Sequence, residues 1–284
     1  MIQIKKYIVL FSLIVFSLFL YSSLIAQNYE QTLQFAEKQL TEQNYDVALK
    51  TFKRLIFFNK NKSNYLLHKK VAEIALLKKD YETAGLYFGL AYNIAEEDQI
   101  KTGLLFDKAY SQILNKKYQF AIIDLFSINT DDIQTQRKLN FYLGTCYYGL
   151  GKFDKSKKYF SLCINENTRF ALDSLFLDKK LISPSPKKAR ILSMIFPGLG
   201  QFYAGNIKQG INSMILTTGL FAIGIYSSVT IDPLYGIVTV LPWFQRYYQG
   251  GYTNAEKFAL TKRTKNRSDI YNNIIKFISS DNNP

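Results

Sequence analysis

The sequence predicts an all-helical protein in two parts, an array of helical hairpins followed by a helical hairpin that crosses a membrane. Three observations predict this fold class. A short phrase around an aromatic residue recurs four times, apolar residues follow each phrase at helical spacing, and an uncharged apolar stretch follows a glycine-rich segment near residue 200. With 284 residues, 48% of them hydrophobic, the chain is long and apolar enough for about two domains.

The recurring phrases define the hairpin array. Their aromatic residues lie 36, 37 and 35 positions apart, and they are Tyr45, Tyr81, Tyr118 and Phe153. Each phrase also shares two small positions and one large apolar position with the others. These are Ala36, Ala48 and Phe52 in the first repeat, Ala72, Ala84 and Phe88 in the second, Ala109, Ala121 and Leu125 in the third, and Gly144, Ser156 and Phe160 in the fourth. A fixed period of this length is typical of stacked helical hairpins, in which small residues allow two helices to approach closely.

Over residues 29–167 these phrases resemble the tetratricopeptide family, in a degenerate form. No Trp begins any repeat, the usual terminal Pro is missing, and Ser156 replaces the small Ala of the second helix. The resemblance implies a tetratricopeptide-like solenoid, a right-handed superhelix whose concave face is lined by the first helix of each repeat. It implies that extended or helical peptides dock in this groove, and it implies no catalysis.

The family's groove positions fall on first-helix residues of all four repeats. In the first two repeats they are Leu33, Glu37, Leu40, Lys69, Glu73 and Leu76. In the last two they are Phe106, Tyr110, Ile113, Phe141, Thr145 and Tyr148. The last six predict an aromatic surface that grips apolar side chains of a partner. The alternative is that a helix over residues 169–181 or the membrane domain covers them.

The N-terminus has the layout of a signal peptide. Lys5 and Lys6 precede an apolar run over residues 7–20, and small residues lead to Ala26. We expect a signal peptide over residues 1–26, with cleavage after Ala26, and an uncleaved anchor is the alternative. Either segment exports the residues that follow it, so the repeats are expected in the periplasm of a bacterial cell envelope, with envelope proteins or peptides as partners.

Proline residues separate the two parts of the chain. Pro184 and Pro186 cannot continue a helix, so residues 27–182 are expected to form the repeat array and residues 183–190 a linker rich in Pro and Lys. A helical membrane domain is expected over residues 191–260, and a basic polar tail over residues 261–284. The run over residues 191–196 stops at Pro197, which predicts a short or re-entrant helix.

Two segments of the membrane domain are candidate spans. Residues 210–230 carry no charge and are long enough to cross a bilayer core of ~30 Å. Residues 233–248 form a shorter second candidate, with Pro242, Trp243 and Arg246 toward one end, where aromatic and basic residues settle at lipid headgroups. Counting residues 189–203 as a third crossing is a further option.

A glycine-rich motif precedes the first of these spans. It consists of Pro197, Gly198, Gly200, Gln201, Tyr203 and Gly205, followed by Gly210. Together with the residues around 247–259, the motif is similar to a small bacterial envelope domain of uncharacterised function with two membrane helices. Glycines permit tight helix contact in lipid, and Gln201 can satisfy backbone groups freed at the helix break, so a packing role explains the motif. The functional alternative is a lipid headgroup or ion site at the broken helix.

Charge distribution favours a membrane partner over nucleic acid. The chain has 36 basic and 22 acidic residues, and residues 181–284 hold 11 basic but only 4 acidic ones around the apolar segments. A genome rich in A and T explains the abundant Lys equally well, and an exported protein is poorly placed to meet nucleic acid. Membrane topology stays open, because the loop near Asp232 lacks Lys and Arg while basic residues flank the hairpin, and the positive-inside rule then opposes export of the repeats.

Residues for catalysis or metal binding are sparse. The single histidine, His68, and the two separated cysteines, Cys146 and Cys163, cannot build an ordinary zinc site, and no catalytic constellation is recognisable. The cysteines are expected as buried thiols, with a disulfide as the alternative. We therefore expect a membrane-anchored scaffold without enzymatic activity, cofactor or small-molecule substrate. The alternative function is a small membrane channel or lipid-handling module gated by the repeats.

Overall fold

A computed structural model describes residues 29–58 and 64–281 of the chain. These residues form 13 α-helices and two short 3-10 helices, and they contain no strand, which confirms the all-helical prediction. The chain divides into two compact units between Lys152 and Phe153. The predicted signal peptide, residues 1–26, lies outside the described residues.

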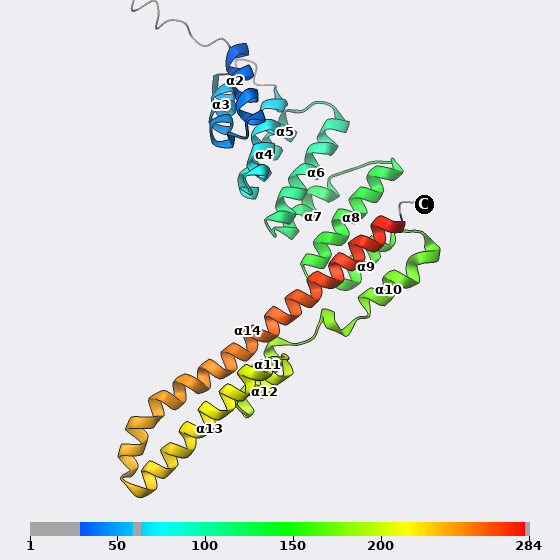
Figure 1. The fold of residues 1–284 in the computed structure, drawn as a ribbon. Coiled ribbons are helices and arrows are strands. Elements are labelled where there is room, and N and C mark those ends of the chain that lie inside the picture. The colour runs from blue at the N-terminus through cyan, green and yellow to red at the C-terminus, as the bar shows by residue number, and fades with distance from the viewer. Residues whose placement is uncertain (1–28, 59–63, 282–284) are drawn as a thin grey trace, which may run out of the picture. The chain divides into compact units, whose positions relative to one another are not determined.

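The N-terminal unit consists of helical hairpins in sequence. Its helices are α2 (Tyr29–Thr41), α3 (Tyr45–Phe58), α4 (Tyr65–Leu77), α5 (Tyr81–Ile94), α6 (Asp98–Leu114), α7 (Tyr118–Phe126) and α8 (Ile133–Gly149). Each helix packs against the next one along the chain, as Figure 1 shows. The second helix of each complete hairpin begins at the aromatic residue of the repeated phrase.

The same turn joins the two helices of each hairpin. Gln43, Lys79 and Lys116 occupy equivalent positions and have φ angles of 61°, 61° and 58°. The N–H group of the next residue donates to a carbonyl five residues earlier, as from Lys117 to Gln112 over 2.8 Å. This arrangement is a Schellman motif, which satisfies the last carbonyls of the first helix and reverses the chain.

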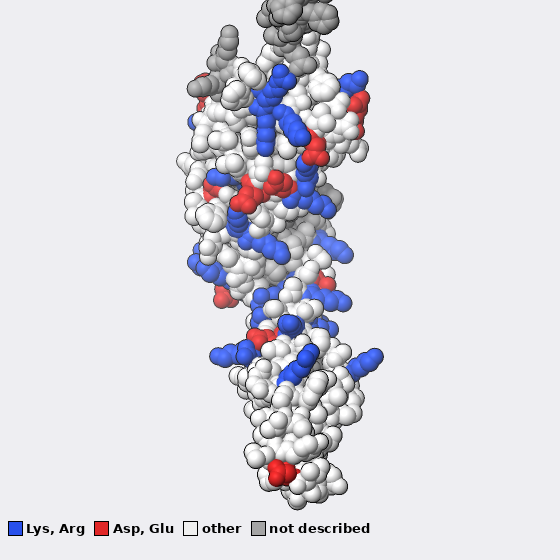
Figure 2. Space-filling model, turned by 90° about the vertical axis from the view of Figure 1, so that its left-hand side faces the viewer, with Lys and Arg blue, Asp and Glu red and all other residues white. Residues whose placement is uncertain are grey.

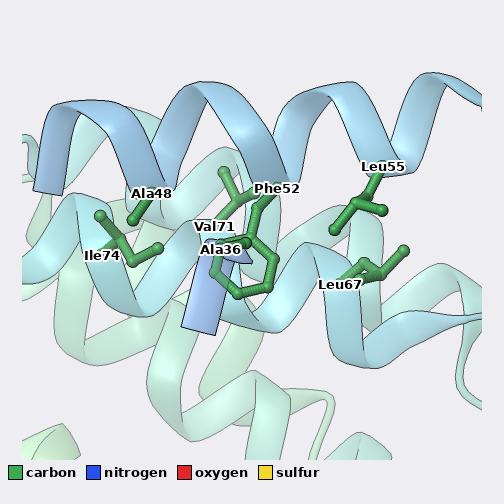
Figure 3. Packing of buried hydrophobic residues seen from close by; sticks show 7 residues of the cluster. All are labelled: Ala36, Ala48, Phe52, Leu55, Leu67, Val71 and Ile74. Carbon is green, nitrogen blue, oxygen red and sulfur yellow. The ribbon is translucent and has the colours of Figure 1, made fainter. Parts of the chain in front are cut away.

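The predicted small and large positions of the repeats form the core. Side chains of α3 point toward those of α4 in the first cluster, with Phe52 close to Ala36 and Val71 (Figure 3). Every predicted small or large apolar position in the described repeats is buried. Burial of a large apolar side chain such as Phe52 stabilises the fold by about 1.5–3 kcal/mol. Spacing in the sequence therefore identified the core correctly.

The C-terminal unit begins with short helices. They are α9 (Phe153–Ser161), η1 (Glu166–Thr168), α10 (Arg169–Phe176), η2 (Lys179–Leu181), α11 (Pro186–Ile195) and α12 (Leu199–Tyr203). The helix expected over residues 169–181 is thus α10 followed by a 3-10 turn. Part of the expected linker is helical, because Pro186 occupies the first turn of α11, where its missing N–H is harmless, and the Ser185 side chain caps that helix.

Two long antiparallel helices complete this unit, α13 (Ile207–Thr230) and α14 (Pro233–Asp281), and Figure 1 shows them joined by a tight turn. Helix α14 contains 49 residues and continues without interruption past residue 260, where the sequence suggested a polar tail. Its last turns bury Ile270, Ile274 and Ile278, which lie on one helical face. The Arg267 side chain donates to the Leu181 carbonyl over 2.7 Å. One helix therefore connects the apolar hairpin with the short helices at the start of the unit.

Candidate functional site

Helices α6 and α8 carry an aromatic cluster in the N-terminal unit. We define it as Phe106, Tyr110, Phe141 and Tyr142. The ring of Tyr142 lies 5.5 Å from Phe106, 6.5 Å from Tyr110 and 6.2 Å from Phe141, measured between centroids. The ammonium group of Lys138 lies 4.4 Å from the centroid of Phe106, in a cation–π arrangement. Tyr142 is therefore the centre of the cluster.

Burial changes the acidity of Tyr142, at the centre of this cluster, and of Asp107, which follows Phe106 in α6. It raises the pKa of Tyr142 to about 12, and the nearby Asp107 carboxylate and Tyr110 add to the shift. Burial also raises the pKa of Asp107, although Lys69 and Lys138 oppose the change. Both opposing cations have other contacts, since Lys69 lies 3.9 Å from Glu73 and Lys138 lies over Phe106. Asp107 is thus a partly desolvated carboxyl group whose charge is incompletely balanced.

The six predicted groove residues occupy different environments. Tyr110 is 44% exposed, whereas Phe106 and Tyr148 are buried, and Ile113, Phe141 and Thr145 are half-buried. The repeat register selected Phe141 and missed its neighbour Tyr142, whose ring contacts Phe106 and Tyr110 of α6. Sequence reasoning also missed Asp107 and Lys138. The repeat pattern selects residues on one narrow face of each first helix, whereas the surface formed by two neighbouring helices includes residues outside that face.

The cysteine and histidine side chains pack against neighbouring residues of the fold. Cys146 and Cys163 are buried thiols, and burial raises the pKa of Cys146 to about 12, so this thiol is a poor nucleophile at neutral pH. The imidazole of His68 lies 3.4 Å from the Asn64 carbonyl oxygen and near the ring of Tyr87. Within residues 29–58 and 64–281, no three His, Cys, Asp or Glu side chains gather so that they could hold a metal ion.

The glycine-rich motif of the C-terminal unit forms a buried polar junction around Gln201. The Ser193 hydroxyl donates to the Gln201 side-chain oxygen over 2.7 Å and accepts from the Gly200 N–H over 2.9 Å. The Gln201 amide group donates to the Gly251 carbonyl over 2.8 Å. These three bonds, which we call the Gln201 junction, tie together α11, α12 and α14. At the break between α11 and α12, the Ser193 hydroxyl accepts from the freed Gly200 N–H group. The sequence did not single out Ser193 for this role.

The motif glycines allow close backbone approach at this junction. A Cβ atom at Gly200 would collide with the Ala189 carbonyl oxygen and lie 2.6 Å from Ser193 Oγ. A Cβ atom at Gly210 would lie 2.6 Å from the Phe202 ring. Gly198 has a φ angle of 95°, and a Cβ atom there would collide with the Gly210 carbonyl oxygen. Side chains at these positions would force α11, α12 and α13 apart.

The remaining motif residues form the ends of the short helices. Pro197 follows the end of α11 and separates it from α12, and Gly205 takes a φ angle of 81° in the turn before α13. The Tyr203 hydroxyl accepts from the Ser185 N–H over 3.1 Å, which connects α12 with the start of α11. Helices of ten and five residues reach only about 15 and 8 Å, so neither α11 nor α12 alone spans a bilayer core.

Helix α13 is long and apolar enough to cross a membrane. Its 24 residues extend about 36 Å, and only 11% of an apolar 18-residue stretch of this helix is buried inside the protein. Small residues bring α14 close to it, since a Cβ atom at Gly224 would touch Val240 at 3.3 Å. Apolar side chains on both helices face outward. The exposed ones include Ile215, Phe221, Ile223, Ile225, Val229, Leu234, Ile237, Val238 and Leu241.

Charge is nearly absent from this hairpin. Between Gln209 and Gln245 the only charged residue is Asp232, which lies in the turn. The hairpin end at the bottom of Figure 2 is accordingly white, with acidic atoms at its tip and basic side chains only farther up. An outward apolar surface of this extent is unusual for a soluble monomer.

Comparison with protein-family models, curated proteins and solved structures finds no match to this chain.

Proposed function

We propose that this protein is a membrane-anchored scaffold of the bacterial cell envelope, which binds other proteins through the groove of a tetratricopeptide-like array. The observation that carries the proposal is the aromatic cluster on the first helices α6 and α8, together with the exposed apolar hairpin of the other unit. Regular hairpins with buried small residues favour a solenoid, and solenoids commonly bind proteins along the surface of their first helices.

The groove favours a partner segment with one apolar and one basic side chain. Tyr110 offers an exposed ring beside Tyr142, and exposed tyrosines are frequent anchors in protein interfaces. Asp107 is partly desolvated, and its two neighbouring cations have other contacts. A basic side chain from the partner would balance this carboxylate. We therefore expect the partner to place an aliphatic or aromatic residue against Tyr110 and a Lys or Arg beside Asp107.

Site-specific photo-crosslinking in living cells tests the groove. A photoreactive amino acid at position 110 should capture a discrete partner, whereas the same residue at position 120 should not. Phe120 is the matched control, because it is a 60% exposed aromatic residue of α7 in the same unit. Tyr110→Ala, tested with a crosslinker at a neighbouring groove position, should lower the yield. Equal capture at positions 110 and 120 would argue against a groove.

The membrane anchor is proposed as two crossings by α13 and the first part of α14. Apolar residues surround both helices, and Trp243 and Arg246 lie toward the end opposite the turn. With an exported array, the turn then faces the cytoplasm. The alternative keeps the hairpin on one side, with its turn embedded in the lipid.

Cysteine labelling distinguishes these topologies, because both native cysteines are buried. Glu97→Cys reports on an exposed loop of the array, and Ile231→Cys on the exposed hairpin turn. An impermeant maleimide should label position 97 in intact spheroplasts, and position 231 only after permeabilisation. If position 231 stays unlabelled even after permeabilisation, the turn is embedded in the lipid, and labelling of both positions in intact spheroplasts would also refute two crossings. Protection of position 97 would place the array in the cytoplasm.

A further inference from the structure

A polar pocket lies at the base of the apolar hairpin, between α12, α13 and α14. Its volume is about 280 Å³, just below the usual range of about 300–1,000 Å³ for ligand sites. Its polar lining includes Gln201, Gln209, Asn212, Ser213, Thr217, Arg246 and Asn254. The lining contains hydroxyl groups, carboxamides and one guanidinium group, but no carboxylate. This composition suits an oxygen-rich anion.

Two hydroxyl groups of α13 lack a hydrogen-bond partner in the pocket wall. Among the described residues, Ser213 Oγ and Thr217 Oγ1 are buried polar atoms without a partner, and the Thr217 residue is only 2% exposed. Hydroxyl groups in such helices ordinarily donate to the carbonyl four residues earlier, as Thr218 does to Met214 over 2.6 Å. Thr217 lies next to Thr218 yet makes no such bond. A buried hydroxyl without a partner is unfavourable, and an acceptor atom of a ligand would satisfy it.

The depth of the pocket points to a membrane ligand. Thr217 lies 13 residues before the end of α13, or about 20 Å from the turn, and Arg246 lies 13 residues after the start of α14, at a similar distance. With the turn at one surface of a ~30 Å core, Arg246 lies below the opposite headgroup layer. Arginine is unfavourable there unless an anion or water reaches it. Apolar Leu216 and Phe258 also line the pocket, beside these polar groups.

We propose that this pocket binds the phosphate group of a phospholipid, with Arg246 pairing with the phosphate and the Ser213 and Thr217 hydroxyls donating to its oxygens. The inference rests on the membrane placement proposed above and is independent of protein binding by the groove. The Gln201 side chain donates to Gly251 and accepts from Ser193, so Gln201 holds the pocket wall in place while the other polar groups contact the anion.

Native mass spectrometry of the full-length protein in detergent tests the proposal. Phosphatidylglycerol should be retained with one-to-one stoichiometry, and diacylglycerol, which lacks the phosphate, should not. Arg246→Gln should weaken retention about tenfold, since a hydrogen bond to a charged group is worth about 1.5–3 kcal/mol. Thr217→Val, which keeps the side-chain shape, should weaken it several-fold. Thr218→Val and Lys208→Gln are the matched controls and should leave retention unchanged.

The remaining outcomes show whether the pocket binds lipid or soluble phosphate, and which results would overturn the proposal. If inorganic phosphate or glycerol phosphate displaces the lipid at equal concentration, the pocket takes soluble phosphate and the lipid assignment is overturned. Equal effects of Lys208→Gln and Arg246→Gln would indicate charge attraction without a pocket. If Thr217→Val raises the melting temperature but leaves lipid retention unchanged, the hydroxyl has no ligand and the proposal fails. Circular dichroism of each variant shows whether it is folded, and the cysteine labelling above reports membrane placement separately.

Discussion

The side-chain amide of Gln201 donates to the backbone carbonyl oxygen of Gly251 over 2.8 Å, although the two residues lie 50 positions apart. Gln201 is 1% exposed and also accepts from Ser193. A single glutamine therefore connects the short helices before the apolar hairpin to its second long helix. Because Ser193 and Gln201 are buried, each side chain depends on the other for its hydrogen bonds.

Gln201→Met should destabilise the C-terminal unit. Methionine has a similar length but no amide group, so the Ser193 hydroxyl and the Gly251 carbonyl each lose a partner, at about 1–3 kcal/mol for each buried group. Thermal unfolding in detergent measures the effect as a lower melting temperature. Gln249→Met is the control, because Gln249 is exposed on the same long helix. Equal melting temperatures for the two variants would mean that the Gln201 junction contributes no net stability.

Gly200→Ala should disrupt the same junction by a different mechanism. The added methyl group would overlap the Ala189 carbonyl oxygen, and backbone atoms cannot move aside as flexible side chains do. We expect loss of the folded C-terminal unit or a large fall in melting temperature. Gly219→Ala is the matched control, since a Cβ atom at Gly219 meets nothing within 4 Å. If both variants behave like the parent protein, α11 and α12 do not pack as closely as described.

Lys116→Gly should stabilise the N-terminal unit. Lys116 has a φ angle of 58°, which is unfavourable for a side chain by about 1–2 kcal/mol, whereas glycine adopts it without strain. The greater freedom of glycine in the unfolded chain offsets part of this gain, so we expect about 0.5–1 kcal/mol. Urea unfolding measures it. Gly151→Ala, at a φ angle of 71°, should change stability in the opposite direction.

The sequence predicted the repeats well because their signal is periodic. Aromatic residues at a nearly fixed interval marked the start of each second helix, and the small residues nine positions earlier are buried as expected. Periodicity depends on packing within one hairpin and its neighbour, so it can be read along the chain. Contacts such as those of Tyr142 depend on the rotation of one helix against another, and the spacing does not specify that rotation.

The C-terminal unit was harder to predict, because its contacts depend on how helices are rotated against one another and not on a repeated spacing. The sequence showed the helix break at Pro197 and the apolar run of α13, but residues 261–281 appeared as a polar tail. Most of their charged residues lie on the exposed side of a helix whose buried positions in this stretch are isoleucines four residues apart. The sequence also could not show that the Thr217 hydroxyl lacks a hydrogen-bond partner. Thr217 and Thr218 are the same residue type, and only the structure shows that Thr218 donates to a carbonyl while Thr217 does not.

Asp107→Asn should stabilise the N-terminal unit at neutral pH while weakening partner capture. Burial raises the pKa of Asp107, so the folded protein binds this proton more tightly than the unfolded chain does. The contribution of Asp107 to stability therefore falls as pH rises above the ordinary carboxyl range, and the advantage of asparagine should shrink at acidic pH. Asp132 gives the opposite case, because hydrogen bonds from Thr135 lower its pKa, and its stabilising contribution is lost as pH falls. Urea unfolding of Asp107→Asn and of Asp132→Asn at pH 4 and pH 7, combined with crosslinking at position 110 for the first variant, measures these effects. Greater stability with undiminished crosslinking would show that Asp107 is merely an unfavourable buried carboxyl, and that the partner offers it no cation.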